Sequence, residues 1–269
     1  MELEVLGVGN AFTSRHYNTS FLLRAERWIL IDGPQALFRL LLERKIPLEG
    51  INDVIVTHVH GDHVSGLETL MLWKKYAEGR RIRLHTTGTV YQDLEQLFFG
   101  RLRTTFNGDY TRLVSTELPD YVEFHELAEE GVTAMTPSVS VEVRYNWHPV
   151  ATLGLKLSCA SGVIGISGDT CYRPPLLRQL REQGILSESR YRKLTGDWLW
   201  DADVIYHEAD RLEPSPHTLE KDLLKLPERV RTKIRLVHFP DDFDERDLPL
   251  AREGERVLSE NGSLKLVLP

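Results

Sequence analysis

The stretch THVHGDH places four side chains that commonly bind transition metals within six residues: His58, His60, Asp62 and His63. Imidazole and carboxylate groups together favour zinc, with manganese or iron as alternatives. Side chains two residues apart point the same way from an extended backbone, so His58 and His60 can share one ion. Gly61 would allow a tight bend at low steric cost, and beyond it Asp62 and His63 can turn toward a second ion. The stretch therefore predicts half of a site for two divalent metal ions.

The other ligands of such a site should come from isolated histidines and aspartates at strand ends. Three residues fit this description: His148 ends SVEVRYNWH, Asp169 ends VIGISGD and His238 ends IRLVHF. One residue of this kind is usually structural. Three of them, downstream of a four-ligand cluster, indicate coordination, because a metal ion needs several converging donors.

The predicted elements would bring these residues to one edge of a sheet. THVHGDH follows the β-branched strand DVIVTH and precedes a helix whose apolar residues recur at helical spacing: Leu67, Leu70, Met71 and Trp73. Loops at strand ends can hold reactive groups while the strands keep them in place. Along the chain, strands and helices predict an α/β fold of two mixed β-sheets with helices on their outer faces. We expect a single domain over residues 1–269, with a charged helical insertion at about 172–200.

Composition excludes several classes of protein. Hydrophobic residues make up 41% and charged residues 27% of the chain, as in globular proteins with a sizeable core. A formal net charge of -7 argues against binding nucleic acid through a general positive field. The N-terminal MELEVLGVGNAF lacks the pattern of an export signal, and no apolar run approaches the ~20 residues that span a bilayer. With only Cys159 and Cys171, we expect a cytoplasmic protein with reduced thiols and no membrane contact.

The full set of motifs resembles the metallo-β-lactamase superfamily. The string His-x-His-x-Asp-His, a later lone His, the Asp of SGDT and a final His occur in the superfamily's order. The resemblance implies an αββα sandwich with a dinuclear site at one edge of the sheets. It also implies the ligands of each metal: His58, His60 and His148 for the first, Asp62, His63 and His238 for the second, and Asp169 as the bridge. Asp32, in ILIDG, resembles the aspartate that supports the site by hydrogen bonding without binding metal.

The same resemblance favours hydrolysis over redox chemistry. Superfamily members that reduce oxygen typically carry Glu at the position of His60. Two neighbouring metal ions can bridge a hydroxide, lower its pKa toward neutrality and clamp the attacked group. The resemblance further implies that Asp62 is close enough to this hydroxide to accept its proton.

A second pair of motifs indicates which bond is cut. YHEAD at 206–210 and SPHT at 215–218 are similar to paired loops of ribonuclease Z and related zinc phosphodiesterases. By this resemblance His217 reaches the scissile phosphate and Glu208 orients it. An imidazolium held by a carboxylate can stabilise charge on phosphate oxygens or protonate the leaving oxygen. Glu208, His217 and Asp62 are therefore the candidate catalytic residues.

Candidates for substrate binding come from loops and basic segments. His207 lies in the first of the two motifs, and Arg15 and His16 lie in TSRHYNTS, a loop that borders the metal site in the superfamily. Two basic segments are further candidate phosphate-binding surfaces: residues 172–200, and the stretch that contains Arg80, Arg81, Arg83, Arg101 and Arg103. Surfaces of mixed charge are usually only solvated, which is the alternative for both.

The match to ribonuclease Z is incomplete. Asp210 stands where that family has Thr, and HFPDDF follows the last ligand where the family has a serine and an arginine. Only twenty residues separate His148 from Asp169, so the long basic arm that grips transfer RNA is missing from its usual place. This absence favours a small or cyclic nucleotide over folded RNA as the substrate.

The sequence therefore predicts a dinuclear, metal-dependent phosphodiesterase that acts on a small or cyclic nucleotide or on an RNA phosphodiester. An acyl hydrolase of lactonase, thioesterase or glyoxalase II type is an alternative, and it would not require His217. Outside enzymes, a binding protein with a closed, metal-stabilised site is a further alternative. Because relatives usually pair, we also expect a homodimer.

Overall fold

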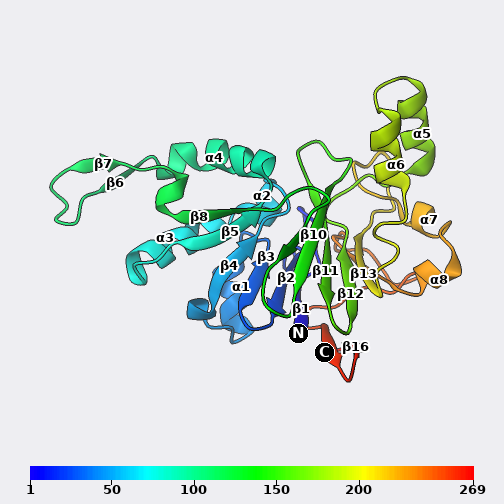
Figure 1. The fold of residues 1–269 in the computed structure, drawn as a ribbon, viewed down its shortest axis with the longest axis horizontal. Helices are drawn as coiled ribbons and strands as arrows, with labels where there is room; N and C mark the ends of the chain where they lie inside the picture. Colours follow the sequence, from blue (N-terminus) through cyan, green and yellow to red (C-terminus); the bar gives the residue numbers. More distant parts are fainter.

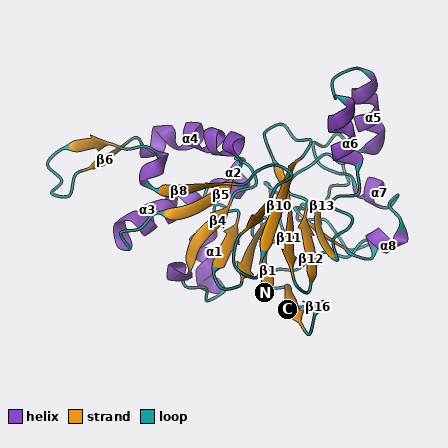
Figure 2. Ribbon diagram, in the orientation of Figure 1, coloured by secondary structure: helices purple, strands orange, loops and turns teal.

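Two β-sheets packed face to face form the body of the molecule (Figure 1). The computed structural model describes residues 1–269. The sheets share one hydrophobic core of 56 buried residues, and helices lie outside them (Figure 2). This architecture confirms the predicted α/β sandwich of two mixed sheets. The single-domain organisation stays a prediction.

The larger sheet has eight strands. Its order is β16 (Ser263–Val267), β15 (Arg256–Glu260), β1 (Glu2–Gly7), β2 (Ser20–Arg24), β3 (Trp28–Ile31), β4 (Ile51–Ile55), β5 (Ile82–Thr86) and β8 (Val122–Glu126). Pairing is antiparallel from β16 to β3 and parallel from β3 to β8. Strands β3 and β4 are almost wholly buried and rich in Ile, Leu and Val, as parallel strands covered on both faces must be.

The smaller sheet has six strands. Its order is β14 (Ile234–Val237), β13 (Val204–Glu208), β12 (Gly162–Ile166), β11 (Leu153–Cys159), β10 (Ser140–Tyr145) and β9 (Val132–Ala134). Pairing is antiparallel from β9 to β12 and parallel from β12 to β14. Parallel strands end at the same edge of a sheet, so the loops after β12 and β14 emerge together.

Helices flank both sheets (Figure 1). Their bounds are α1 (Leu37–Glu43), α2 (Gly61–Val64), α3 (Leu67–Ala77), α4 (Gly88–Leu102), α5 (Pro174–Glu182), α6 (Glu188–Thr195), α7 (Glu220–Leu223) and α8 (Glu228–Arg231). Two 3-10 helices cover Leu48–Gly50 and Leu118–Asp120. Helices α5 and α6 occupy the segment predicted as a charged helical insertion and rise above the sandwich in Figure 1. None of the helices is both long enough and apolar enough to cross a membrane.

Several elements differ from those the sequence pattern predicts. Residues 101–120 show no clear period, yet a hairpin of β6 (Thr104–Phe106) and β7 (Leu113–Ser115) projects from the body there (Figure 1). Strands β8, β9 and β15 are also unexpected, because they are short and partly exposed and carry little hydrophobic signal. The predicted helix in TLEKDLLKL shortens to α7.

Candidate metal centre

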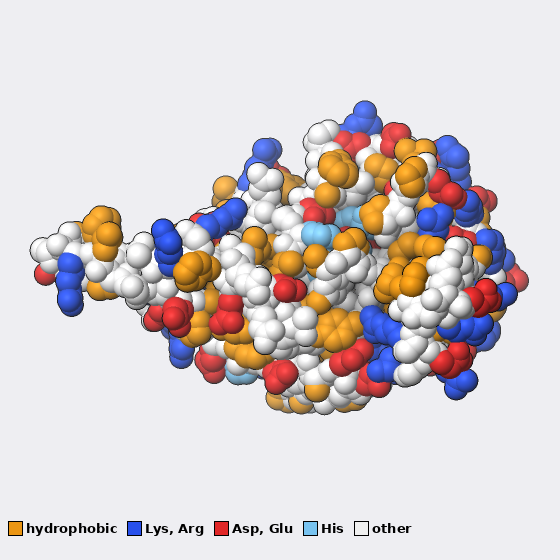
Figure 3. Space-filling view, turned by 90° about the horizontal axis from the view of Figure 1, so that it is seen from above, with side chains coloured by type: hydrophobic (Ala, Val, Ile, Leu, Met, Phe, Trp, Pro, Cys, Tyr) orange, Lys and Arg blue, Asp and Glu red, His pale blue; other side chains and the backbone are white.

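The predicted ligands meet at the edge where strands of both sheets end. His58 and His60 follow β4, Asp169 follows β12 and His238 follows β14. His148 reaches the same place from the loop after β10. Seen from above, histidine side chains lie beside acidic ones in a hollow near the middle of this face (Figure 3). The fold therefore joins loops that are far apart in the chain.

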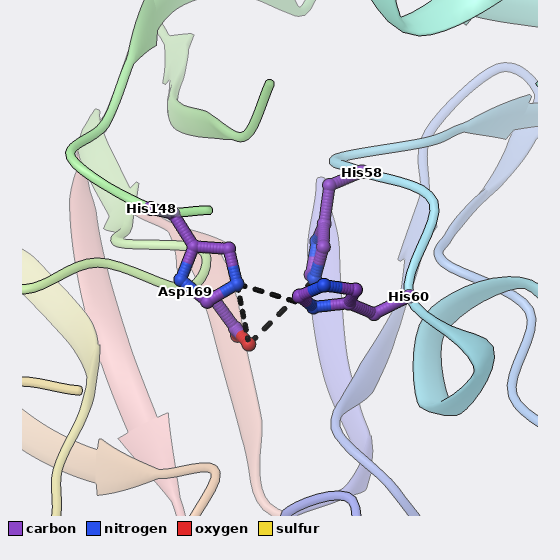
Figure 4. Close-up of side chains that lie close together, drawn as sticks. All are labelled: His58, His60, His148 and Asp169. Atoms are coloured by element: carbon purple, nitrogen blue, oxygen red, sulfur yellow. Dashed lines mark hydrogen bonds and ion pairs between the residues drawn. The ribbon is translucent and has the colours of Figure 1, made fainter. Parts of the chain in front are cut away.

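One group of ligand atoms comes from His58, His60, His148 and Asp169, whose side chains point toward one another (Figure 4). His60 Nδ1 lies 3.1 Å from His148 Nε2. Asp169 Oδ2 lies 3.6 Å from His58 Nε2 and 3.9 Å from His148 Nε2. All four ligand atoms lie within 4.8 Å of one another, close enough to surround a single ion.

A second group contains Asp62, His63 and His238. Asp62 Oδ2 lies 3.1 Å from His238 Nε2 and 3.4 Å from His63 Nε2. Asp169 contacts this group too, because its Oδ1 lies 3.4 Å from His63 Nε2 and its Oδ2 lies 3.4 Å from His238 Nε2. One carboxylate therefore stands between the two groups, where it could bridge two ions.

The state of these side chains suits metal binding. His58 Nε2 and His63 Nε2 are buried without a hydrogen-bond partner, which is costly unless a cation lies beside them. Burial lowers the pKa of His58 well below its ordinary value and that of His148 to about 4, and neutral imidazole is the form that binds metal. Burial opposes ionisation of Asp169, but the surrounding imidazoles outweigh it and lower the pKa of the carboxyl. The cluster therefore fits divalent metal ions.

Asp32 lies behind the cluster and belongs to neither ligand group. Its Oδ2 lies 2.8 Å from His63 Nδ1. Its carboxylate also accepts hydrogen bonds from the amide of Thr57 at 2.8 Å and from the Thr57 hydroxyl at 2.7 Å. A carboxylate on the outer ring nitrogen fixes the tautomer and aims the other nitrogen at the metal. This is the geometry that a supporting aspartate requires.

Glycines play different roles in the two ligand loops. Gly168 precedes Asp169 and has a φ of 58°, and a Cβ there would lie 2.2 Å from the carbonyl oxygen of Leu153. That loop requires glycine. Gly61 instead starts α2, and a Cβ there would meet only Ser65 Oγ at 3.2 Å. The bend in THVHGDH is a helix start, and Gly61 does not have the positive φ that would require glycine there.

Glu208 and His217 form an ion pair beside the ligand groups. His217 Nδ1 lies 2.8 Å from Glu208 Oε2, and its ring centroid lies 4.8 Å from that of His238. Burial lowers the pKa of His217, but the Glu208 carboxylate raises it more strongly, to about 9. Bound cations would bring this pKa back toward neutrality. The pair therefore places a proton donor at the edge of the ligand cluster.

Thr218 is a residue of this site that the sequence analysis missed. Its amide donates a 2.7 Å hydrogen bond to Glu208 Oε1. Its hydroxyl donates to the carbonyl of Thr170 at 3.1 Å and accepts from the amide of Tyr172 at 3.0 Å. Thr218 thereby ties the loop of His217 to the loop that follows Asp169. Its signals in the sequence were its place at the end of SPHT and its position directly after a catalytic candidate.

The structure does not bring His207 to the ligand cluster. Side chains alternate across a strand, so His207 and Glu208 point to opposite faces of β13. The His207 ring is buried and stacks on Trp200, with centroids 5.5 Å apart. Its Nδ1 lies 2.7 Å from the carbonyl oxygen of Glu208. His207 thus packs in the interior, which argues against the substrate-binding role predicted for it.

Arg15 and His16 lie on the loop between β1 and β2, beside the segment that follows β14. The ring of His16 meets Phe239 edge-on at 5.7 Å. The amide of Arg15 donates a 3.2 Å hydrogen bond to Asp241, which also holds the two residues before it. The sequence analysis gave Asp241 no role, but it anchors this loop next to the last predicted ligand. Both residues stay candidates for contact with substrate.

Ion pairs within the protein occupy most basic residues of the 172–200 segment and two of the five arginines of the other candidate surface. Arg83 binds the buried Asp53 through two nitrogen atoms, and Arg101 lies 2.9 Å from Glu68. In the 172–200 segment five basic residues pair with acids: Arg173, Arg181, Arg190, Arg192 and Lys193. These contacts explain the residues structurally and weaken the prediction that they bind phosphate.

The fold and the ligand cluster define a metal-dependent hydrolase of the metallo-β-lactamase fold. The metallo-β-lactamase fold protein YhfI from Bacillus subtilis superimposes with a TM-score of 0.67 at 15% identity, over 95% of this chain and 98% of that one. A family profile described as Anti-Pycsar protein Apyc1 matches residues 1–263, and the chain belongs to this family.

Relatives with assigned names agree with this placement. Anti-Pycsar protein Apyc1 of Saccharibacillus brassicae is 29% identical over 269 residues, which cover 97% of this chain and 98% of the relative. The cAMP/cGMP-dependent 3',5'-cAMP/cGMP phosphodiesterase B of Dictyostelium discoideum is 29% identical over 246 residues, which cover 89% of this chain and 20% of the relative. The predicted superfamily and the predicted metal-dependent phosphodiesterase class are thus confirmed.

Proposed function

We propose that this protein hydrolyses the phosphodiester bond of small cyclic nucleotides. The observation that carries this proposal is the His217–Glu208 pair, which holds the His217 ring beside the ligand cluster, with its centroid 4.8 Å from that of His238 and 5.7 Å from that of His148. An alkoxide leaving group needs a proton, and a positioned imidazolium supplies one. The relative named as a cAMP/cGMP phosphodiesterase supports the same class of substrate.

In this proposal each ligand group would hold one ion, and Asp169 would bridge the two. The first ion would be held by His58, His60 and His148, and the second by Asp62, His63 and His238. Zinc suits a donor set of several imidazoles and carboxylates, with manganese or iron as alternatives. When bound, the ions would activate a water molecule for attack and neutralise charge on the phosphate. Burial opposes ionisation of Asp62, but His238 and His63 lower its pKa and keep the carboxylate ionised. In this proposal the ionised carboxylate would accept the proton of the water.

His217 would serve the opposite side of the reacting phosphate. Its Nδ1 faces Glu208, which leaves Nε2 to donate a proton to the leaving oxygen. The His217 side chain is 21% exposed whereas that of Glu208 is 1% exposed. The imidazole can therefore reach a ligand, while the carboxylate can act only through the imidazole. Glu208 is in this view the residue that orients and charges His217.

The loops around the site favour a small substrate over folded RNA. Between His148 and Asp169 the chain forms only β11, β12 and their connections, so no arm projects at the place where ribonuclease Z resemblance would put one. Five of the six basic residues between positions 172 and 200 pair with acids. An RNA phosphodiester stays a second substrate to be tested beside cyclic nucleotides.

A substrate screen on metal-replete protein tests the proposal. Cyclic nucleotides, an RNA oligonucleotide, bis(p-nitrophenyl) phosphate, a thioester and a lactone would be supplied separately and the products identified by chromatography. We expect cyclic nucleotides to open to linear mononucleotides, and His217→Ala to slow this reaction by roughly 10²–10⁴-fold. Absence of turnover with every phosphodiester would contradict the proposal. Turnover of an acyl substrate that survives His217→Ala would instead favour an acyl hydrolase.

We further propose that the protein acts as a homodimer in the cytoplasm. The β6–β7 hairpin stands away from the body and exposes Phe106, Tyr110 and Leu113 (Figure 3). An isolated two-stranded hairpin is only marginally stable in water, and a second copy could cover these side chains. Both cysteines are free thiols, which suits a reducing compartment. Light scattering should give twice the chain mass, and a monomeric mass at micromolar concentration would contradict the dimer.

A further inference from the structure

His217 lies on a loop whose two ends meet at Asp210. The Asp210 amide donates a 2.8 Å hydrogen bond to the carbonyl of Thr218, and the Asp210 carbonyl accepts a 2.9 Å bond from the amide of Glu220. Between these contacts the loop contains no helix or strand. Backbone outside regular structure depends on side chains to satisfy and orient it. The position of His217 therefore depends on bonds made inside this loop.

The Asp210 carboxylate makes those bonds with both of its oxygens. Oδ1 accepts hydrogen bonds from the amides of Arg211 at 2.7 Å and Leu212 at 3.1 Å. Oδ2 accepts a 2.8 Å bond from the hydroxyl of Ser215, and that hydroxyl oxygen accepts a 3.1 Å bond from the amide of His217. A continuous chain of hydrogen bonds thus runs from Asp210 through Ser215 to the backbone of His217.

We infer that Asp210 is a positioning residue for His217 and acts through the Ser215 hydroxyl. This inference rests on the proposed function of His217 as the acid for the leaving oxygen. Glu208 holds the imidazole at Nδ1, but a single contact to the ring leaves the backbone free to shift. The Ser215 bond holds the backbone amide of the same residue. The two contacts together determine where Nε2 stands. A displacement of about 1 Å in such a group can cost roughly 10²-fold in rate.

The departure at Asp210 from the ribonuclease Z motif has a chemical reason in this loop. A threonine side chain presents one oxygen, whereas a carboxylate presents two. One carboxylate oxygen serves the turn that begins the loop and the other serves Ser215. Threonine at this position could not do both, so the aspartate and Ser215 work as a pair.

Two single variants remove the pair in different ways. Asp210→Asn keeps one oxygen for the turn amides but places an NH₂ group toward Ser215, which removes the acceptor of its hydroxyl. Ser215→Ala removes the hydroxyl, and Ser215→Thr restores one. Asp109→Asn is the matched control, because Asp109 accepts hydrogen bonds from the amide and hydroxyl of Thr111 in the turn of the β6–β7 hairpin, away from the site.

The kinetic test compares two substrates with metal-replete enzymes. For a cyclic nucleotide, whose leaving alkoxide needs a proton, we expect kcat to fall by roughly 10²-fold in Asp210→Asn and in Ser215→Ala, with KM and metal content near wild type. For bis(p-nitrophenyl) phosphate, whose leaving aryl oxide needs no proton, the fall should be much smaller. The double variant should be no slower than either single variant, because both break one chain. Ser215→Thr should recover most of kcat, and Asp109→Asn should match wild type.

Three kinetic results would overturn the inference. They are wild-type kcat in both variants, equal losses on the two substrates, and additive losses in the double variant. Equal losses would mean that the changes disturb the whole site, and additive losses would mean that the two residues act separately.

The ring of His217 supplies a readout that does not depend on turnover. Its Nδ1 lies 2.8 Å from Glu208 Oε2, and a proton on this nitrogen should give a downfield NMR signal, identified by its loss in His217→Ala. We expect this signal to shift or broaden in Asp210→Asn and Ser215→Ala but not in Asp109→Asn. If the wild type cleaves no phosphodiester, the proposed function fails while this signal still decides the positioning role. An unmoved signal in both variants would overturn the inference whatever the activity.

Discussion

Two buried clusters contain similar side chains: the ligand cluster beyond β4 and a second cluster within the same sheet. They differ in whether neighbouring side chains neutralise their charges. In the second cluster Asp53 is bound by Arg83 through two nitrogen atoms, lies 2.9 Å from His85 Nε2 and lies 3.4 Å from Arg27 Nη1. Each of these neighbours of Asp53 is a cation or a hydrogen-bond donor directed at the Asp53 carboxylate. The Asp53 cluster is therefore complete without any ligand.

In the ligand cluster no arginine or lysine meets the carboxylates, and only histidines contact them. His60 Nδ1 and His148 Nε2 face each other at 3.1 Å, and His58 Nε2 is buried without a partner. Its acids and imidazoles converge as acceptors on common points, which is the arrangement that a cation completes. Histidine and aspartate together therefore do not identify a metal site. A metal site is identified by the direction of their lone pairs, and the fold sets that direction.

The largest expected difference between the clusters is in metal and activity. His60→Ala removes an imidazole from the first ligand group and should abolish both bound metal and hydrolysis. His125→Ala is the matched control, because His125 stacks on His85 at 4.9 Å outside both ligand groups and should leave both properties intact. Elemental analysis with a phosphodiester assay measures the effect. Retention of two ions by His60→Ala would contradict the ligand assignment.

The second largest expected effect is on stability. Here a change in the Asp53 cluster should lower stability and leave metal binding intact. Asp53→Asn leaves Arg83 and Arg27 facing a neutral group, and we expect the free energy of unfolding to fall by about 2–4 kcal/mol. The loss should stay below that of a fully buried pair, because both arginines are partly exposed and can rehydrate. Denaturant titration measures it, with the exposed Asp201→Asn as control. Folded Asp53→Asn protein should bind metal normally, and a loss of metal would show that the clusters are coupled.

A smaller effect is expected behind the ligand cluster. Asp32→Asn replaces the carboxylate oxygen that faces His63 Nδ1, so the ring loses its fixed tautomer and direction. We expect metal affinity to fall by about 10–100-fold, with much of the fold's stability retained. Competition with a chelator of known affinity measures the change. Unaltered metal affinity would mean that Asp32 stabilises the backbone at Thr57 and does not orient His63.

The smallest effect is the response of the Asp53 cluster to acid. Burial opposes ionisation of Asp53, but Arg83 and His85 lower its pKa well below its ordinary value. The stabilisation is therefore complete above the unfolded-state pKa of about 3.9 and decreases as the pH falls toward the folded-state pKa. The stability difference between wild type and Asp53→Asn should shrink by about 1 kcal/mol between pH 7 and pH 3. A difference that is constant with pH would contradict an ionised Asp53.

Local patterns were sufficient to predict the fold class and the candidate ligands. The ligands of THVHGDH are adjacent in the chain, and the chemistry of imidazole and carboxylate is independent of context. His148, Asp169 and His238 were found because each ends a segment with a strand pattern. The structure brings all of them into the two ligand groups, together with Asp32 behind them.

The sequence alone could not predict contacts between segments that are far apart in the chain. Arg83 looked free to bind phosphate, but β4 pairs with β5 in a register that sets it opposite Asp53. His207 looked like a neighbour of the substrate, although its alternation with Glu208 along β13 turns it to the opposite face of the sheet, where Trp200 covers it. Register is decided by pairing across the sheet, and no local pattern contains it.

The sequence by itself determined which residues could bind metal and which chemistry they could perform, because donor types and short spacings are properties of the chain. The resemblance implied that Asp169 bridges the metals and that Glu208 orients His217, but only the tertiary structure brings these side chains within contact distance. Only the tertiary structure also shows that Asp210 reaches the backbone of His217 through Ser215. Those relations depend on the ends of separate strands arriving at one edge. Their positions are set by packing over the whole core, which spacing along the chain does not specify.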